Sequence, residues 1–142
     1  MIAIINYGMG NLKSIQRKFD KLSISSIITS SHEEISKADK LILPGVGHFK
    51  KGMENLNKLN IIELLNEQVI KKKVPILGIC LGMQLMTEMS EEGNTLGLGW
   101  IKGSMQKFQV KDKIQYKVPH IGWNSVHIQK NSPLFKDINQ NE

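Results

Sequence analysis

Short runs rich in apolar residues alternate with segments of helical spacing over the first half of the chain, and this alternation limits the folds available to it. The runs are residues 2–6, 24–29, 39–43 and 74–79. Such runs are typical of strands that are covered on both faces. Strands separated by amphipathic helices require right-handed crossovers. The sequence therefore predicts an α/β fold with a mainly parallel open sheet and helices on both faces.

The helical segments carry recognisable start and break signals. Asn11 is placed to cap a helix over residues 12–22, and Ser31 has the capping-box spacing for a short helix. Apolar residues recur at helical spacing through residues 48–73, which predicts two helices with a bend near Asn60.

After Gly93 the pattern changes to shorter segments of alternating character. Residues 100–110, 114–118 and 125–129 are predicted as strands joined by turns, which indicates an antiparallel extension of the fold. No repeat or linker interrupts the chain, so residues 1–142 are expected to form a single domain, incomplete at its C-terminus.

Composition narrows the class of protein. The chain has 142 residues, of which 40% are hydrophobic and 23% charged, a balance typical of one globular domain. No apolar run approaches the roughly 18 residues that a membrane span needs, and residues 2–6 are too short for a signal-peptide core. Cys80 is the only cysteine, so a reducing cytoplasm is the expected compartment.

The formal net charge of +6 comes mostly from lysine, with Arg17 as the single arginine. Aromatic residues make up 6% of the chain and are not interleaved with the basic ones. Because nucleic-acid binding calls for such interleaving or for arginines, no nucleic-acid partner is expected. The charge indicates a solvated lysine-rich surface or, alternatively, a basic face for a phosphorylated metabolite or an acidic partner.

The segment Gly78–Gly82 has the form Gly-x-nucleophile-x-Gly, with Cys80 at its centre. It follows an apolar run and precedes helical spacing over residues 81–89, which is the context of a nucleophile elbow. The tight turn requires small flanking residues, and the backbone N–H of Leu81 becomes a candidate oxyanion-hole donor. The alternative is an ordinary buried cysteine in a glycine-flanked turn.

Two other glycine-rich turns follow predicted strands. Pro44–Gly47 ends a strand at the same carboxyl edge of the sheet, where its N–H groups can face an oxyanion; a plain turn is the alternative. Tyr7–Asn11 contains two glycines but lacks the third glycine and the acidic residue of a dinucleotide-binding turn. No nucleotide site is therefore expected there.

A cysteine nucleophile needs an imidazole to take its proton and later to protonate the leaving amine. The histidines of the chain are His32, His48, His120 and His127. None of them stands in a His-x-acid pattern late in the chain, and His48 is interpreted as a bystander beside the Pro44–Gly47 turn. Their spacing fits no metal site, so neither a metal nor a cofactor is expected.

Six segments carry these features in a fixed order. They are Asn6–Leu12, Leu43–Phe49, Pro75–Gln84, Ser90–Gly93, Gly97–Gly99 and Val118–Asn124. Together they resemble the class I glutamine amidotransferases, and within that family the glutaminase subunits of imidazole glycerol phosphate synthase. The elbow alone marks only the superfamily, whereas the elbow together with Pro-His-x-Gly-Trp-Asn is specific to this subunit. The resemblance implies a flavodoxin-like amidotransferase fold.

The resemblance also implies a reaction. Cys80 would attack the side-chain amide of glutamine and form a thioester. The N–H groups of Leu81, Val46 and Gly47 would form the oxyanion hole. Gln84 and Glu92 match the positions that hold the amino-acid end of the glutamine.

The family further implies a heterodimer with a (β/α)₈-barrel synthase, which uses the ammonia to make imidazole glycerol phosphate and an aminoimidazole carboxamide ribonucleotide in histidine biosynthesis. The residues implied at the partner face are Pro119, His120, Trp123 and Asn124. Trp123 is expected there as an exposed aromatic anchor, with a role in covering the sheet edge as the alternative.

One departure from the family concerns the catalytic base. The family's late His-x-Glu pair is absent from this chain. We therefore expect a form that lacks its C-terminal portion, leaves part of the sheet uncovered and has little or no activity. Other functions stay open: a paralogous subunit for surface-sugar amination, a non-catalytic module that docks on the synthase and, more remotely, a thiol hydrolase or chaperone with the same elbow.

Overall fold

The computed structural model describes residues 1–111, 118, 121–125, 127–130 and 132–136. It divides into two compact units, Met1–Lys107 and Phe108–Glu142, and each is described by itself. The first unit holds two β-sheets and the α-helices. That residues 1–142 form a single domain stays a prediction.

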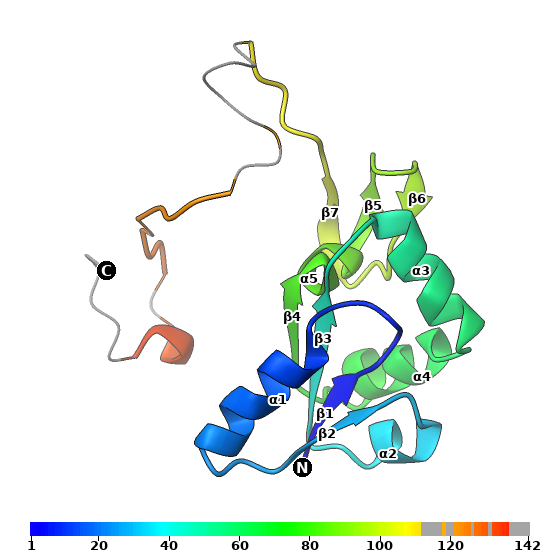
Figure 1. Cartoon of the computed structure of the whole chain (residues 1–142). Helices are drawn as coiled ribbons and strands as arrows, with labels where there is room; N and C mark the ends of the chain where they lie inside the picture. Colours follow the sequence, from blue (N-terminus) through cyan, green and yellow to red (C-terminus); the bar gives the residue numbers. More distant parts are fainter. Residues whose placement is uncertain (112–117, 119–120, 126, 131, 137–142) are drawn as a thin grey trace. The chain divides into compact units, whose positions relative to one another are not determined.

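The larger sheet of the first unit has four parallel strands in the order β2-β1-β3-β4 (Figure 1). The strands are β1 (Ile2–Ile5), β2 (Ser26–Thr29), β3 (Lys40–Gly45) and β4 (Ile76–Cys80). Each was predicted from its apolar run, and the parallel pairing confirms the expected crossover topology.

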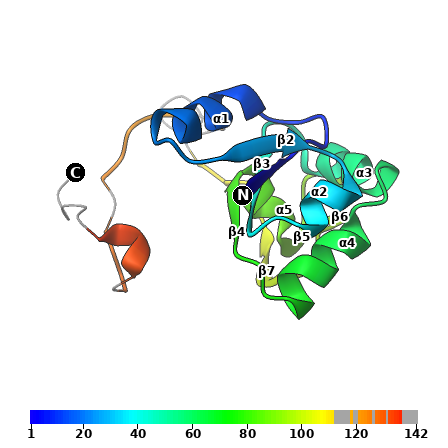
Figure 2. The ribbon, with the colours of Figure 1, turned by 90° about the horizontal axis from the view of Figure 1, so that it is seen from below.

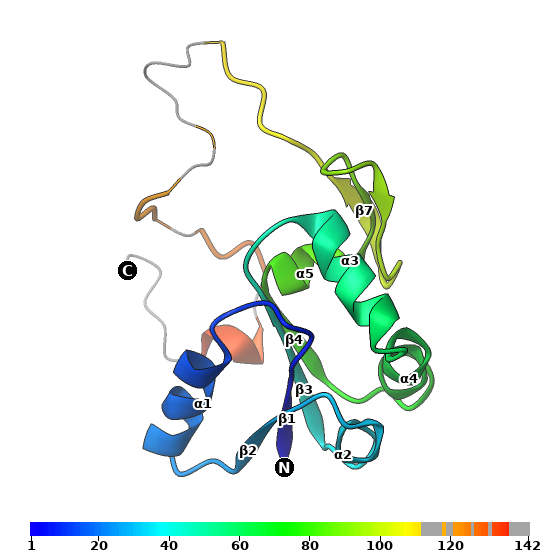
Figure 3. The same cartoon turned by 45° about the vertical axis from the view of Figure 1, so that its right-hand side comes forward.

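Helices cover both faces of this sheet, as predicted. They are α1 (Leu12–Lys21), α2 (His32–Ser36), α3 (Phe49–Lys58), α4 (Ile62–Asn66) and α5 (Leu81–Leu85). Seen from below, α1 lies on one face and the other helices lie on the opposite face (Figure 2). Figure 3 shows α5 at the carboxyl end of β4, with α3 beside it.

The predicted caps explain where the early helices begin. The side chain of Asn11 accepts a hydrogen bond from the N–H of Ser14 at 3.3 Å, and that of Ser31 accepts one from Glu34 at 3.5 Å. The bend near Asn60 is also present, because Asn60 has a φ of 54° and separates α3 from α4. A π-helical turn, Glu67–Lys71, follows α4 directly.

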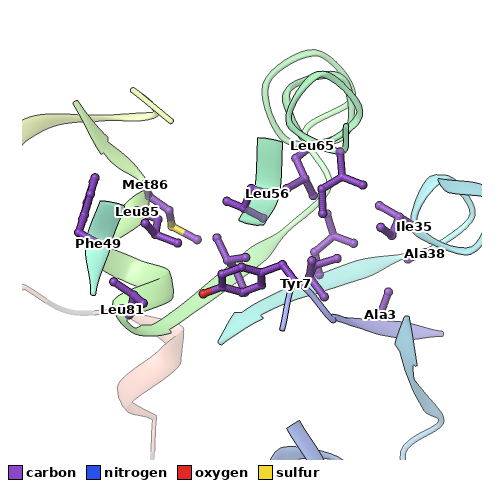
Figure 4. Packing of buried hydrophobic residues seen from close by; sticks show 14 residues of the cluster. Ala3, Tyr7, Ile35, Ala38, Phe49, Leu56, Leu65, Leu81, Leu85 and Met86 are labelled. Carbon is purple, nitrogen blue, oxygen red and sulfur yellow. The ribbon is translucent and has the colours of Figure 1, made fainter. Parts of the chain in front are cut away.

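The core lies on the sheet face that α2 to α5 cover (Figure 4). Because side chains alternate along a strand, Ala3, Ile5, Leu41 and Leu43 all point to this face and are buried. Helical residues such as Leu56, Leu65, Leu81 and Leu85 pack against them. The residues that position the end of β3 and the start of α5 are therefore part of the core.

The opposite face of the sheet is less covered at β4, which lies at the sheet edge. Leu77 pairs with Ile42 in the sheet register, and Ile79 pairs with Pro44. Leu77 is 52% exposed and Ile79 is 38% exposed, whereas Ile42 is buried. Within the first unit, part of the sheet is thus open to solvent.

The helix predicted over residues 81–89 is only partly correct. α5 ends at Leu85, and a smaller sheet begins two residues later with β5 (Thr87–Ser90). The N–H groups of Trp100 and Ile101 both bond to the carbonyl of Met86, at 2.9 and 3.0 Å. These long-range bonds draw the chain into strand pairing, against the helical spacing of its apolar residues.

The smaller sheet has the order β6-β5-β7. Its other strands are β6 (Thr95–Leu96) and β7 (Ile101–Met105). β6 runs antiparallel to β5, but β7 runs parallel to it with a register shift between Thr87 and Met89. The predicted antiparallel extension is therefore a separate mixed sheet, and the strand predicted over residues 100–110 ends at Met105.

In the second unit the structure describes one regular element, the 3-10 helix Pro133–Phe135. Residues 125 and 127–129 are not in a strand, so the prediction for that segment is wrong in its described part. Of the strand predicted over residues 114–118, only Val118 lies among the described residues. Across all the residues that the structure describes, none of the helices combines the length and the hydropathy of a membrane span.

Candidate active site

Cys80 lies at the turn between β4 and α5, in the strand–turn–helix context that the sequence predicts. It is the last residue of the strand and the N-cap of the helix, with φ 54° and ψ −117°. Residues other than glycine rarely adopt this region, and such strain is typical of functional turns. The side chain is exposed rather than buried, which excludes the interpretation of Cys80 as an ordinary core cysteine.

The two flanking glycines are required by close packing. A Cβ on Gly78 would lie 2.6 Å from the Cα of Met83, and a Cβ on Gly82 would lie 1.7 Å from the carbonyl oxygen of Leu43. Both contacts involve backbone, so no side-chain movement could relieve them. The elbow therefore packs closely against β3. Its two glycines allow α5 to begin next to the end of that strand.

The sheet register places the Pro44–Gly47 turn beside the elbow. Gly45 is paired with Cys80, so Val46 and Gly47 continue from β3 next to the start of α5. A Cβ on Gly45 would lie 2.8 Å from the Cβ of Leu81. The structure therefore brings together the two backbone segments predicted to form the oxyanion hole. Leu81 is also the first residue of α5, where an N–H has no partner within the helix.

The side chain of Glu92 lies at the N-terminus of α3, the helix that follows this turn. Its Oε2 accepts a hydrogen bond from the N–H of Phe49 at 2.7 Å, and its Oε1 lies 4.0 Å from Nε2 of His48. His48 is the N-cap of α3, where Nδ1 accepts a hydrogen bond from the N–H of Lys50 at 3.2 Å. The carboxylate thus fixes the helix start that follows the turn, a role that sequence reasoning did not foresee.

Gln84 lies near the end of α5 and is half-buried. Its backbone carbonyl accepts a hydrogen bond from the hydroxyl of Thr87 at 2.8 Å, which closes the helix. Gln84 therefore belongs to the helix that begins at Cys80, while Glu92 belongs to the segment that caps α3. Their predicted role in holding glutamine stays a prediction.

The predicted partner residues fall in the second unit. Trp123 is fully exposed, and Asn124 is exposed as well. Pro119 and His120 lie outside the described residues. Their place at a partner face is likewise still a prediction.

Tyr7 is a site residue to which sequence reasoning assigned no role. It is buried, and its hydroxyl donates a hydrogen bond to the carbonyl oxygen of Pro44 at 2.6 Å. Burial raises the pKa of Tyr7 above the usual tyrosine value, and the negative charge of a Cys80 thiolate raises it further. The only signal in the sequence is an aromatic residue directly before a glycine turn.

Comparison with known proteins agrees with this geometry. The family model described as glutamine amidotransferase class-I matches residues 3–142. A solved structure, "Crystal structure of glutamine amidotransferase", is similar with a TM-score of 0.63 and 14% identity, over 75% of this chain and 57% of that one. At this identity the likeness supports the fold alone.

Curated relatives are much closer in sequence. Imidazole glycerol phosphate synthase subunit HisH 2 of Methanococcus maripaludis is 50% identical over 99% of this chain and 69% of its own length. Subunit HisH 1 of Campylobacter jejuni is 49% identical over 98% of this chain and 69% of its own. Subunit HisH of Oceanobacillus iheyensis is 52% identical over 95% of this chain and 65% of its own.

The family match spans nearly every residue, and the same residues build an elbow with an exposed cysteine beside a glycine-rich turn. The chain belongs to the class I glutamine amidotransferases.

Proposed function

We propose that this chain is the glutaminase subunit of an imidazole glycerol phosphate synthase and serves histidine biosynthesis. The observation that carries the proposal is the elbow at Cys80, whose backbone conformation exposes the thiol beside the Pro44–Gly47 turn. Relatives with HisH names that are about half identical over nearly the whole chain support the choice of subunit.

In the proposed reaction Cys80 Sγ attacks the side-chain amide carbon of glutamine. A C–S bond forms, and the carbonyl electron pair moves to oxygen, which becomes an oxyanion. The N–H groups of Leu81 and of the Val46–Gly47 stretch donate to this oxyanion. When the intermediate collapses, the C–N bond breaks and a proton must reach the nitrogen, so that ammonia leaves and a thioester remains. Water then hydrolyses the thioester to glutamate and restores the thiol.

The proton steps require a base that faces Cys80. Among the described residues, no histidine is hydrogen-bonded to Cys80 Sγ, and His48 is engaged with Lys50 and lies near Glu92. Loss of such a base typically costs 10²-fold or more in rate, so the residue that moves this proton decides how fast glutamine is hydrolysed.

Substrate orientation is proposed for Gln84 and Glu92. Oε2 of Glu92 accepts from Phe49, whereas among the described residues Oε1 is approached by His48 alone, at 4.0 Å, which suits an ammonium group as its partner. A glutamine whose α-ammonium pairs with this oxygen would lie across the start of α3. Gln84, on α5, would also help to orient the glutamine.

The proposed partner is a (β/α)₈-barrel synthase that receives the ammonia and makes imidazole glycerol phosphate and the aminoimidazole carboxamide ribonucleotide. Pro119, His120, Trp123 and Asn124 are the residues proposed at this heterodimer interface, and the exposure of Trp123 suits an anchor. The free Cys80 thiol fits a cytoplasmic setting.

The first test is covalent capture of Cys80 by 6-diazo-5-oxo-norleucine, a glutamine analogue that alkylates the nucleophile of a glutamine site. We expect intact-mass analysis of the full 142-residue chain to give one adduct, located on Cys80 by peptide mapping. The Cys80→Ala variant is expected to give none, and excess glutamine is expected to protect the wild type. Labelling that glutamine does not slow would overturn the assignment of a glutamine site.

A second assay mixes the chain with the barrel synthase and compares glutamine with ammonium salts as the nitrogen source. Imidazole glycerol phosphate formed from glutamine supports the proposal and, if the rate is substantial and depends on Cys80, overturns the sequence-based expectation of little or no activity. Product from ammonium salts alone, with stable docking and no capture of Cys80, would favour the non-catalytic module. Amination of a sugar substrate in place of this product would favour the paralogous subunit.

A further inference from the structure

Tyr7 lies where three chain segments meet: its own loop, the end of β3 and the start of α5. Its hydroxyl reaches the end of β3, where it donates to the carbonyl oxygen of Pro44 at 2.6 Å. A Cβ on Gly45 would lie 2.4 Å from that hydroxyl oxygen and 2.9 Å from the backbone nitrogen of Gly82. Figure 4 shows the Tyr7 ring in the buried cluster with its oxygen directed toward the side of Leu81. One side chain thus touches the peptide that enters the Pro44–Gly47 turn at the point where it meets the elbow.

The rest of the Tyr7–Asn11 loop packs on the same turn. A Cβ on Gly10 would lie 3.2 Å from the backbone nitrogen of Gly45, and a Cβ on Gly47 would lie 2.6 Å from the Cε of Met9. The loop therefore contacts both glycines of the turn, and its packing on the turn does not depend on a single contact.

The loop is itself fixed at two points. The side-chain oxygen of Asn6 accepts a hydrogen bond from the N–H of Gly8 at 3.2 Å. The side-chain amide of Asn55, on α3, donates to the carbonyl oxygen of Tyr7 at 3.0 Å. Tyr7 is therefore held by its backbone on α3 and by its hydroxyl on β3.

The Pro44–Gly47 turn needs such an external support. Gly45 and Gly47 lack a Cβ, so the peptides beside them rotate more freely than others, and Gly47 already has a φ of 129°. A rotation of the Pro44–Gly45 peptide would redirect the N–H groups that follow it. A hydrogen bond to the carbonyl of that same peptide opposes the rotation directly.

We propose that Tyr7 is a positioning residue for glutamine hydrolysis: its hydroxyl fixes the Pro44–Gly45 peptide and thereby aims the N–H groups of Val46 and Gly47 at the oxyanion above Cys80. This inference rests on the proposed function, because it concerns the oxyanion hole of the same site. It gives the Tyr7–Asn11 loop a role in catalysis without any contact with substrate.

The protonation state of Tyr7 agrees with this role. Only the neutral phenol can donate to the carbonyl of Pro44. Burial and the charge of the Cys80 thiolate both raise the pKa of Tyr7, so the hydroxyl stays protonated when the nucleophile is charged.

The test compares Tyr7→Phe with the wild-type full chain in two reactions of the same thiol. Capture of Cys80 by 6-diazo-5-oxo-norleucine requires a formed glutamine site, whereas alkylation by iodoacetamide requires only an accessible thiolate. We expect the diazoketone rate constant to fall by about tenfold, less than the 10²–10³ that follows complete loss of an oxyanion-hole donor. Iodoacetamide alkylation is expected to stay within about twofold, since the thiolate itself is unchanged.

Thr29→Val is the control, because it also removes a buried hydroxyl at the end of β2, one that donates to Glu34 and accepts from the N–H of Ser31. It is expected to leave both rates unchanged. A purely structural role for Tyr7 would lower both rates together or shift only the urea midpoint, and that result would overturn the proposal.

A second variant keeps the test decisive if Tyr7→Phe does not fold. Gly10→Ala introduces a methyl group against the backbone of Gly45 and should give the same selective loss of diazoketone capture. Equal capture by wild type and folded Tyr7→Phe would overturn the role of Tyr7 alone, and equal capture by wild type and folded Gly10→Ala would overturn the role of the loop packing. Absence of glutamine-protected capture in the wild type would instead overturn the proposed function, so the two failures are distinguishable.

Discussion

The Cys80 elbow and the Pro44–Gly47 turn lie side by side at the carboxyl edge of one sheet, yet they are held in different ways. The elbow is fixed by backbone packed against backbone, with Gly78 against Met83 and Gly82 against the carbonyl of Leu43. The turn is also contacted by side chains from elsewhere, Tyr7 and Met9, and Glu92 fixes the start of α3 that follows it. The nucleophile is thus placed by backbone packing and by the pairing of β4 with β3, whereas the predicted oxyanion hole also depends on side-chain contacts that a single substitution can remove.

The largest effect is expected at the elbow, from Gly82→Ala. The added Cβ would meet the carbonyl oxygen of Leu43 at 1.7 Å, and neither backbone segment can yield without displacing β3 or α5. We expect a loss of about 3 kcal/mol or more in the free energy of unfolding, at the upper end of overpacking effects. Urea denaturation followed by circular dichroism measures it.

Gly99→Ala provides the control, because Gly99 lies in a loop at a φ of 69° and has nothing within 4 Å of its Cβ position. Its cost is expected to be about 1 kcal/mol, from the positive φ alone. Equal losses for the two variants would show that the elbow is not sterically fixed.

A smaller effect of opposite sign is expected from Cys80→Gly. The φ of 54° with ψ of −117° is strained for cysteine but accessible to glycine. Relief of about 2 kcal/mol of strain, less the entropic cost of glycine, should stabilise the chain by about 1 kcal/mol. The urea midpoint is the measurement, and Cys80→Ala, which loses the thiol but keeps the strain, should show no gain. A gain in both variants would mean that the thiol, and not the backbone, carries the cost.

An effect of similar or smaller size is expected on the side of the turn, from Glu92. Glu92→Ala removes the acceptor for the N–H of Phe49 at the start of α3 and should cost about 1 kcal/mol, as for other N-terminal caps. Glu92→Gln keeps an acceptor and loses only the charge beside the helix terminus, so about half of that cost is expected. Thermal or urea unfolding checks both values. A loss as large as that of Gly82→Ala would contradict the view that the turn is held by individually modest contacts.

Much of the fold could be predicted because its signals are local. The apolar runs identify the four parallel strands, and Asn11 and Ser31 identify the starts of α1 and α2 from their own side chains. The Gly-x-Cys-x-Gly pattern identifies the elbow, because the glycines on either side are a direct steric requirement of the turn.

The remaining features depend on partners far along the chain. α5 ends early because the carbonyl of Met86 bonds to Trp100 and Ile101, which the local spacing does not reveal. The contact of Tyr7 with Pro44 and that of Glu92 with Phe49 join residues 37 and 43 positions apart. Such pairs become visible only once the strands are placed, which is why the elbow was predictable and the support of the turn was not.

The packing at Gly45, Gly78 and Gly82 also bears on how a chain of this kind can diverge. At each position a first side-chain carbon would lie closer to backbone or to a buried side chain than real contacts allow. A substitution at one of these glycines would be tolerated only if a second segment of the chain shifted as well. A single substitution there is therefore not expected to be accepted. Gly99, in a loop, and Gly103, in β7, have nothing within 4 Å of the Cβ position, so close packing does not restrict sequence change beside them. Sequence change in such a chain should therefore accumulate elsewhere, while Gly45, Gly78 and Gly82 stay unchanged.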